Sequence, residues 1–511
     1  MSTSAEANKR IAKNTFLLYV RMLFTMAVSL YTSRVVLNVL GVEDYGLYNV
    51  VGGFVAMFSF FNGAMAAATQ RYLNFELGRG DASRLHLVFC TSVNIHAIIS
   101  FLVLLLSETV GLWFVYTYLN IPAERFSAAL WVYQASVLSS VVMVMSIPYN
   151  AAIIAHERMG AFAYISVLEV VLKLLIVYLL VIYDIDKLKL YAVLMLLVQV
   201  LICLIYGRYG YKHFTETRYR AIWDSRLFKE MTGFAGWSLF GNIAAVAFTQ
   251  GLNVLLNMFF GSAVNAARGI AVQVQNAITG FCVNFQTALN PQITKSYAAG
   301  DMDYMYGLVF TSSKFSYYLL LLLSMPVILE TQVVLQWWLG IVPEHTVAFV
   351  RLILVISMVD SLANPLIQAA SATGRIRKYQ SVVGTMLIMI LPISYVALKL
   401  NSSPEGVFVV QLIVFCVALF ARLWMLRSLI GLSLRAYCRK AVLPMASVTV
   451  ASAVVPLTVY LLMQPSLLRF LLVCAVSLVA VAATVYCLGL TSNERVFIRE
   501  RLKILKNKFR K

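Results

Sequence analysis

The fold of this chain is decided by a segment that occurs twice. Residues 41–81 read GVEDYGLYNVVGGFVAMFSFFNGAMAAATQRYLNFELGRGD, and residues 261–301 read GSAVNAARGIAVQVQNAITGFCVNFQTALNPQITKSYAAGD. The positions that match, each 220 residues apart, are Gly41 with Gly261, Gly80 with Gly300 and Asp81 with Asp301. Both segments start at a glycine and end in a Gly-Asp turn, which indicates either a duplicated unit or a chance match of turn residues.

A second recurrence lies further along each half of the chain. Pro148 with Arg158 and Pro365 with Arg375 recur at a spacing of 217, in both halves after the fourth apolar stretch. Together the recurrences predict two units of six helices each. Because six is even, both units would enter the membrane from the same side, as a parallel repeat about an axis along the membrane normal. The interface between such units is the natural place for a substrate cavity.

The composition places most of the chain in a membrane. Of the 511 residues, 61% are hydrophobic and only 12% are charged. A helix needs about 20 mostly apolar residues to cross a bilayer, and such stretches are centred near residues 27, 58, 97, 141, 172, 199, 244, 276, 319, 360, 389, 416, 450 and 478. The first stretch, residues 15–40, is too long for the core of a signal peptide, roughly 7–15 residues. We predict an all-α polytopic membrane protein with these fourteen transmembrane helices.

The distribution of basic residues predicts the orientation. With the amino terminus in the cytoplasm, 30 of the 41 Lys and Arg residues fall on the cytoplasmic side, five on the other side and six inside the spans. This bias is typical of membrane proteins. It also explains the formal net charge of +19 without a nucleic-acid partner, because the anionic cytoplasmic leaflet attracts basic residues. We expect a multi-pass protein of the bacterial inner membrane with both termini in the cytoplasm.

The predicted domains follow from the repeat and the span count. Residues 1–220 form an N-terminal six-helix lobe, and residues 221–432 form a C-terminal six-helix lobe that is pseudo-symmetric with the first. Helices 13 and 14, within residues 433–490, fall outside the repeat. Residues 491–511 are a basic cytoplasmic tail, which we expect to form a helix on the membrane surface.

The cysteines and histidines give little support to a metal site or a cofactor. The seven cysteines include no CxxC pair, and nearly all lie in apolar stretches. The five histidines form neither an HExxH motif nor a cluster at ligand spacing. We therefore expect no metal and no cofactor.

Eight charged residues fall within the predicted spans, where each charge costs from about 2.5 kcal/mol upward. They are Arg21, Arg34, Glu169, Lys173, Arg268, Arg351, Asp360 and Arg422. Glu169 and Lys173 are four residues apart on one helical face and can form a structural ion pair. Arg351 and Arg422 lie near helix ends, where such side chains can snorkel. Asp360 falls close to the midplane, where it either pairs with an arginine or takes up a proton, and it is the candidate for ion coupling.

Three arginines form the candidate diphosphate site. Arg34 lies in the first helix of one half and Arg268 in the second helix of the other, both towards the outer side, so they converge if the halves face each other. Arg21, nearer the cytoplasm, can add a second binding position along the same cavity. Guanidinium groups bind phosphate oxygens bidentately, and each contact is worth about 1.5–3 kcal/mol. The pattern favours an anionic substrate; alternatively, these arginines bond helix-end carbonyls and hold the lobes together.

Amide side chains gather on the seventh and eighth predicted helices. Such groups can contact sugar hydroxyls, or they can hold helices together. The candidates for sugar contact are Asn253, Asn257, Gln273 and Asn276.

Several stretches resemble a known family. They are the turn Leu-Gly-x-x-Asp-Tyr-Gly at residues 40–46, Arg71 after the second span, and SIPYNAAIIAHERMGAFAYISVLEVVLKL at residues 146–174. The chain resembles, over nearly its whole length, the Wzx-type polysaccharide (O-antigen and capsule) flippases of the multidrug/oligosaccharidyl-lipid/polysaccharide (MOP) exporter superfamily. The resemblance implies a MATE-like, V-shaped pair of six-helix lobes that alternate access and carry an undecaprenyl-diphosphate-linked oligosaccharide across the membrane. It implies membrane lipids, the lipid-linked substrate, and the polymerase and chain-length proteins of glycan assembly as partners.

Three other functions are alternatives. A multidrug exporter of the same superfamily usually carries cationic drugs, for which arginines are poorly suited. A flippase of lipid-linked peptidoglycan precursors would also place arginines at a diphosphate. A membrane polysaccharide polymerase generally needs a large outer loop, whereas the longest outer segments, residues 108–126 and 330–346, are short and contain no evident acid/base carboxylate pair. We therefore expect a transporter and not an enzyme.

Overall fold

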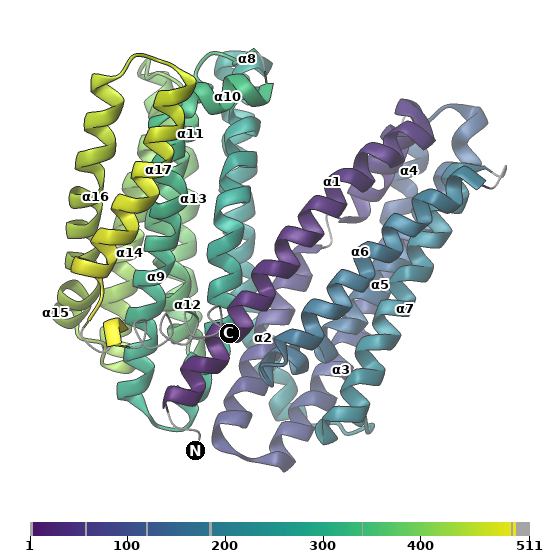
Figure 1. Ribbon diagram of the computed structural model, residues 1–511. Helices are drawn as coiled ribbons and strands as arrows, with labels where there is room; N and C mark the ends of the chain where they lie inside the picture. The colour runs from purple at the N-terminus through teal and green to yellow at the C-terminus, as the bar shows by residue number, and fades with distance from the viewer. Residues whose placement is uncertain are drawn as a thin grey trace, which may run out of the picture. The chain divides into compact units, whose positions relative to one another are not determined.

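The computed structural model describes residues 4–56, 59–118, 121–182, 186–339, 341–491 and 494–496. Within these ranges the chain is built of helices and turns, without a β-strand, as the sequence predicts (Figure 1). Of the predicted tail helix, residues 494–496 are described and helical, and most of the remainder lies outside the described residues.

The helices follow one another in two series. The first series is α1 (Ser4–Ala56), α2 (Ser59–Arg79), α3 (Ala82–Leu106), α4 (Leu112–Tyr118), α5 (Phe126–Ala155), α6 (Met159–Ile182) and α7 (Lys187–His213). The second is α8 (Ser225–Ala298), α9 (Met302–Leu329), α10 (Thr331–Leu339), α11 (Thr346–Asp360), α12 (Ala363–Ala372), α13 (Arg377–Lys399), α14 (Gly406–Ile430), α15 (Leu434–Tyr437), α16 (Leu443–Leu462) and α17 (Leu467–Thr484). Short 3-10 or π-helical turns lie at Ser107–Gly111, Ala123–Arg125, Thr215–Thr217, Cys438–Val442 and Val485–Gly489.

Among the described residues, 12 helical stretches are long and apolar enough to cross a membrane. They cover every predicted span except those centred near residues 58 and 276, which both lie in the repeated segments. The segment around residue 276 is helical but carries several amides, which lower its hydropathy, and the segment around residue 58 includes residues outside the described ranges. The protein is a multi-pass membrane protein.

A glycine with a positive φ breaks each of the two longest helices. Gly41 interrupts α1 with φ 79° and ψ 169°, and Gly261 interrupts α8 with φ 81° and ψ −171°; residues with a side chain rarely adopt such angles. After Gly261 the chain turns back on itself. The evidence is a hydrogen bond from Arg268 to the carbonyl of Thr249, 19 residues earlier. In a straight helix these residues would be about 28 Å apart. The two limbs of α8 are therefore the separate seventh and eighth helices that the sequence predicts.

Positive φ angles also confirm the internal repeat. The pairs are Gly41 (79°) with Gly261 (81°), Gly80 (75°) with Gly300 (78°), and Glu157 (59°) with Gly374 (74°). The first two pairs keep the spacing of 220, and the third has the spacing of 217 that relates the two Pro-Arg stretches. A chance match of turn residues would not reproduce the backbone angles at all three places. The two halves therefore share one backbone plan.

The helices pack into two compact units. Unit 1 comprises Met1–Ile243, Thr287–Met302 and Gly374–Ser381, and unit 2 comprises Ala244–Gln286, Asp303–Thr373 and Val382–Lys511. The chain thus passes from one unit to the other twice within α8, at the start of α9, between α12 and α13, and within α13. The domain boundaries drawn from the repeat stay a prediction.

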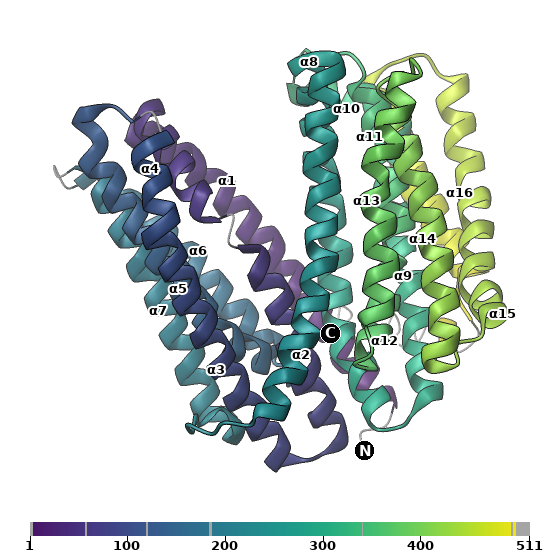
Figure 2. The same ribbon diagram turned by 180° about the vertical axis from the view of Figure 1, so that it is seen from behind.

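In unit 1, α5 is the central helix. It packs against α2, α3 and α7, while α1 lies along α6 (Figures 1 and 2). The side chain of Tyr133 in α5 is fully buried and donates a hydrogen bond of 2.6 Å to the carbonyl of Ser107 at the end of α3. Burial of such aromatic side chains supplies much of the packing energy of a core.

Two short segments from the second half of the chain complete unit 1, residues 287–302 and 374–381. The first lies directly against α2, where a β-carbon on Gly78 would come within 2.5 Å of the Lys295 carbonyl oxygen and 2.8 Å of the Ala298 β-carbon. Only a glycine at position 78 permits this approach of the two backbones.

The second segment approaches Arg71, one of the residues that carry the family resemblance. The Arg71 guanidinium lies 4.4 Å from the Tyr72 ring centre, 4.7 Å from that of Phe75 and 5.7 Å from that of Phe234. It also reaches Gly374, where a β-carbon would come within 2.7 Å of it. Arg71 therefore has a packing role at this end of unit 1.

A buried carboxylate joins three elements of unit 1. The Glu157 side chain, in the turn between α5 and α6, is 1% exposed and lies 2.6 Å from Lys295 Nζ. Gln292 donates to the same oxygen at 2.7 Å, and Asn14 of α1 donates to the Glu157 carbonyl at 3.2 Å. Because a buried ion that loses its partner is costly, this cluster fastens α8 to α1 and to the α5–α6 turn.

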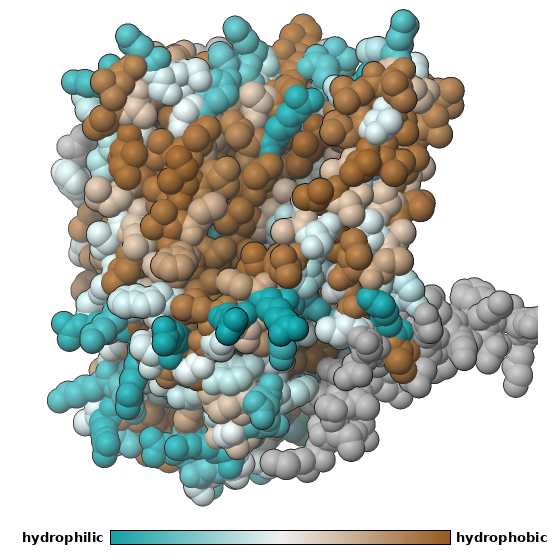
Figure 3. Space-filling view, turned by 90° about the vertical axis from the view of Figure 1, so that its left-hand side faces the viewer, coloured by the Kyte–Doolittle hydropathy of each residue, from teal (hydrophilic) through white to brown (hydrophobic). Residues whose placement is uncertain are grey.

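In unit 2, two ion pairs fasten the last helices to α9. Arg469 in α17 and Glu330 after α9 form a buried pair with two hydrogen bonds, of 2.8 and 2.9 Å. Lys314 of α9, 3% exposed, lies 2.9 Å from Glu494. The face that carries α16 and α17 shows an apolar belt between hydrophilic ends (Figure 3), as expected of a surface that faces lipid.

We predict that Gly78→Ala lowers the stability of the purified protein by about 1–3 kcal/mol, because the added methyl group clashes with the α8 backbone. Thermal melting in detergent measures the change. Gly207→Ala in α7 is the matched control, since a β-carbon there has no atom within 4 Å; it should raise stability by about 0.5–1 kcal/mol. Equal melting temperatures of the two variants would contradict the close α2–α8 contact.

Candidate functional site

Unit 2 contains a polar cavity of about 410 Å³. Its wall is formed by both limbs of α8 and by α9, α11, α12 and α14. The polar residues that line it are Thr249, Arg268, Gln275, Asn276, Thr279, Gln286, Ser357, Asp360, Ser361, Asn364 and Gln411. Polar groups within a membrane-spanning bundle need hydrogen-bond partners, and a polar substrate can supply them. We therefore take this cavity as the candidate site.

Arg268 is held in the cavity wall by the other limb of its own helix. The Arg268 guanidinium donates from Nη1 to the Asn253 side-chain oxygen and from Nη2 to the Thr249 carbonyl, the latter at 3.0 Å. Asn253 is in turn oriented by its hydrogen bond of 3.0 Å to Gln250. Arg268 therefore bonds a backbone carbonyl, as in the structural alternative that the sequence left open. Asn253 serves as its second acceptor.

The Arg268 guanidinium retains donors for a ligand. The residue is 5% exposed, and its Nε is buried without a hydrogen-bond partner among the described residues. A guanidinium has five N–H donors, and a buried donor without an acceptor is costly. An oxygen-rich anion that enters the cavity would satisfy this donor.

Asp360 is the acidic counterpart on the same wall. Its side chain is exposed, and its residue lines the cavity. Arg422 of α14 is the cation whose charge acts on it most directly. Arg422 is 6% exposed, so the expectation that it snorkels to the membrane surface is wrong: its side chain is buried within unit 2.

Arg351 has a helix-end role. Its Nε donates to the Ile328 carbonyl at 2.9 Å, near the end of α9. The last carbonyls of a helix lack intrahelical donors, and Arg351 supplies one. It is absent from the residues that line the cavity.

An amide network forms another part of the wall. Gln286 donates to the Ser316 hydroxyl and the Ser361 carbonyl, both at 2.9 Å, and accepts from Asn364 at 2.8 Å. Both glutamine donors and its oxygen are therefore used within the protein. The sequence gives no sign of this pairing, because Gln286 and Asn364 are 78 positions apart.

The sugar-contact candidates lie in different surroundings. Asn276 is exposed and lines the cavity, whereas Gln273 is exposed but is not among its lining residues. Asn253 is the partner of Arg268. The side chains of Asn257 and Arg34 lie outside the described residues.

The remaining predicted residues lie in unit 1. Arg21 stacks on Phe162, with its guanidinium carbon 4.6 Å from the ring centre. Since Arg21 belongs to unit 1 and Arg268 to unit 2, the convergence of the arginines stays a prediction. Lys173 Nζ lies 2.5 Å from Glu169 Oε1 within α6.

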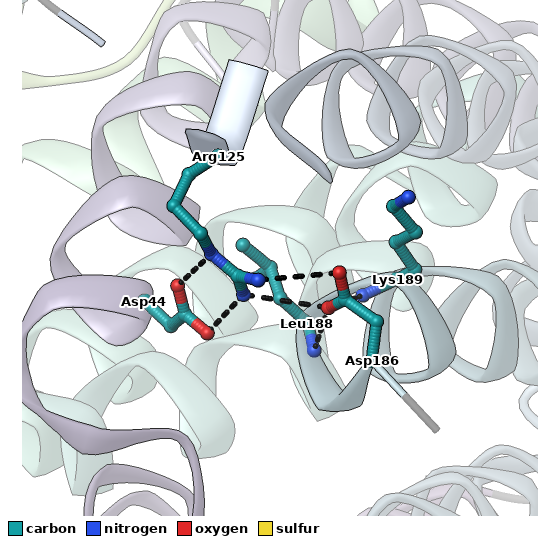
Figure 4. A network of polar contacts seen from close by, with 5 residues as sticks. All are labelled: Asp44, Arg125, Asp186, Leu188 and Lys189. Atoms are coloured by element: carbon teal, nitrogen blue, oxygen red, sulfur yellow. Dashed lines mark hydrogen bonds and ion pairs between the residues drawn. The ribbon is translucent and has the colours of Figure 1, made fainter. Parts of the chain in front are cut away.

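Sequence reasoning missed a second charged cluster, in unit 1 (Figure 4). Arg125 binds Asp44 through Nε at 2.8 Å, and it reaches Asp186 at 3.2 Å. Asp186 also caps α7 by accepting from the amides of Leu188 and Lys189. Asp44 is the aspartate of the Leu-Gly-x-x-Asp-Tyr-Gly turn, so this motif residue serves to tie α1 to the starts of α5 and α7.

The described residues offer no obvious metal centre. Among them, no group of three or more His, Cys, Asp or Glu side chains is placed to hold a metal ion. The polar side chains of the cavity wall are neutral amides, hydroxyls and single charges, and they lie among apolar residues such as Phe248 and Phe415.

No protein-family model matches this sequence, and no curated protein matches it. Solved structures do match the fold. They include a MATE protein in the bent conformation (15% identity, TM-score 0.71, 83% of this chain and 96% of that chain) and an outward-facing multidrug resistance MATE family transporter of the MOP superfamily (14%, 0.70, 83% and 96%). A third is a MOP superfamily transporter from Pyrococcus furiosus, described by a reverse polarity of its binding pocket that suggests a different function (14%, 0.68, 84% and 96%). The chain therefore has the MATE-like fold that the sequence predicts.

We predict that Asn253→Leu lowers stability by about 1.5–3 kcal/mol, because it removes an acceptor from a buried guanidinium. Asn253→Asp keeps the oxygen and should retain most of the stability. Asn276→Leu, at an exposed position of the wall, should change it little. Thermal melting of the three variants measures these differences, and an unchanged melting temperature for Asn253→Leu would contradict the Arg268 geometry.

Proposed function

We propose that this protein is a flippase that moves an undecaprenyl-diphosphate-linked oligosaccharide, such as an O-antigen or capsule repeat unit, across the bacterial inner membrane by alternating access. One observation carries the proposal. Arg268, buried in the wall of a polar cavity, keeps a donor without an acceptor among the described residues. A diphosphate oxygen would supply that acceptor in a place sheltered from water, where charge-assisted hydrogen bonds are strong.

The rest of the wall suits the sugar part of such a substrate. Amide and hydroxyl groups of Asn276, Thr279 and Gln411 line the cavity beside Arg268. They are neutral and can both donate and accept, as recognition of sugar hydroxyls requires. The polyprenyl chain needs no polar site, since it is soluble in the bilayer.

Alternating access requires contacts that can open and close. In unit 1, residues 287–302 are fastened to first-half helices by the Gly78 contact and the Glu157–Lys295 pair. We infer that this end of unit 1 is a gate and that these contacts break once per cycle. The ion pair, the hydrogen bond of Gln292 to the same carboxylate and the glycine contact are discrete interactions, and such elements can exchange between two arrangements.

The fold by itself does not fix the substrate. The Pyrococcus furiosus transporter of similar fold is described as having a binding pocket of reverse polarity and a different function. In the present chain, the arginine in the cavity favours an anionic cargo.

Asp360 favours a second candidate function, the export of organic cations. Asp360 lines the same cavity, and its carboxylate could attract a cationic drug. The positive charges of Arg268 and Arg422 oppose that attraction. We therefore place Asp360 in ion coupling and keep the drug exporter as the alternative that the next experiment addresses.

We predict that undecaprenyl diphosphate raises the melting temperature of the purified protein and that Arg268→Gln abolishes the rise. A ligand at 100 times its Kd stabilises a protein by about 2.7 kcal/mol, which is easily measured. Arg351→Gln is the matched control, because Arg351 bonds a helix end outside the cavity; it should keep the full response.

Two outcomes would count against this proposal. Stabilisation by cationic drugs but not by the lipid diphosphate would favour the multidrug exporter. A full response to the lipid in Arg268→Gln would remove Arg268 from the phosphate site.

We predict that Asp360→Asn abolishes the dependence of transport on a proton or sodium gradient, because an amide can neither take up a proton nor bind a cation by charge. Flipping of a fluorescent lipid-linked oligosaccharide in proteoliposomes, with and without each gradient, measures the dependence. Gln411→Asn, a neutral change on the same wall, should leave it intact. A gradient response that survives Asp360→Asn would exclude Asp360 as the coupling residue.

A further inference from the structure

The segment that joins α7 to α8, residues 214–224, is fixed along one face of α3, and we call it the strap. Three α3 residues spaced four apart bond it in register: His86 to the Glu216 carbonyl at 3.0 Å, Cys90 to the Arg220 amide at 3.4 Å and Asn94 to the Ile222 carbonyl at 2.9 Å. Residues spaced in this way share one helical face. The strap is therefore a surface of defined shape.

Where the strap passes Asn94, it forms a groove of about 310 Å³ with α3. The groove is lined by Asn94, Ala97, Ile98, Tyr219, Ile222 and Trp223. The Tyr219 hydroxyl donates to Asn94 at 2.8 Å, which fixes one wall. Tyr219 is 47% exposed and Trp223 is 58% exposed, so both rings leave large apolar surfaces uncovered.

The groove lies at the level where the surface of α3 changes from polar to apolar. Beyond it, Phe101, Leu102 and Leu105 are all exposed, by 48–64%, as side chains that face lipid tails are. Trp and Tyr rings are enriched at such membrane interfaces. The groove therefore faces the head-group region of one leaflet.

The strap brings positive charge to this level. Arg218 and Arg220 flank Tyr219 and are exposed. The two acidic residues of the strap point elsewhere: Glu216 is buried against His156, and Asp224 accepts from the Arg226 and Leu227 amides at the start of α8. The exposed side of the strap is therefore cationic.

We propose that the strap and α3 form a binding site for an anionic phospholipid, with its phosphate at Arg218 and Arg220 and its glycerol and first acyl carbons in the groove against Ile222 and Trp223. Arginine suits phosphate because its planar group offers parallel donors. The apolar groove adds selectivity for a lipid over a soluble phosphate. This site is independent of the proposed transport function.

The test is native mass spectrometry of the full chain in detergent with added phosphatidylglycerol or phosphatidylcholine. The wild-type protein should retain phosphatidylglycerol preferentially. Arg218→Gln with Arg220→Gln should lower that retention about fivefold for each arginine. Arg435→Gln with Arg439→Gln, which removes two exposed charges of unit 2, is the matched control and should retain the lipid as the wild type does.

Three results would overturn the proposal. Equal retention of phosphatidylcholine would show that charge is irrelevant, and an equal loss in the control pair would show that any basic surface suffices. Competition by glycerophosphoglycerol, which has no acyl chains, at the same concentration as the lipid would identify a site for soluble phosphates. Melting temperatures of both pairs would verify that the exposed substitutions leave the fold intact.

Discussion

The break at Gly261 is the constraint on which the cavity depends. A straight α8 would carry Arg268 far from Thr249 and Asn253, and the guanidinium would then lack both of its acceptors. The positive φ turns the second limb back so that one helix supplies both the cation and the groups that hold it. Gly41 has nearly the same angles in the first half, so the same device shapes both halves of the chain.

The sequence predicts much of this fold because its signals are local. Apolar stretches mark the spans, and the glycine spacings of 220 correspond to matching backbone angles in the structure. The equivalence of Glu157 and Gly374 in the repeat cannot be seen in the sequence, because a glutamate rarely adopts a positive φ. At that position, the surrounding contacts override the intrinsic preference of the residue.

The site is less predictable, since its interactions join residues far apart in the chain. The charge of Arg268 marks it in the sequence, but the sequence does not show that Asn253, whose amide can either contact sugar or hold helices together, is its acceptor. The position of Arg422 near a helix end predicts that its side chain snorkels, whereas the packing of unit 2 buries it. Charge and depth along a helix can be counted from the sequence, but the direction in which a side chain points depends on the neighbouring helices.

The buried pair of Lys314 and Glu494 has a practical consequence for work with this protein. Glu494 lies in the last described part of the chain, yet its partner is inside unit 2, 180 residues earlier. A chain trimmed before residue 494 would leave a buried ammonium group without its carboxylate, which costs several kcal/mol. Truncations made to aid crystallisation must therefore retain Glu494. Purification tags and fluorescent fusions at this end of the chain belong after the tail.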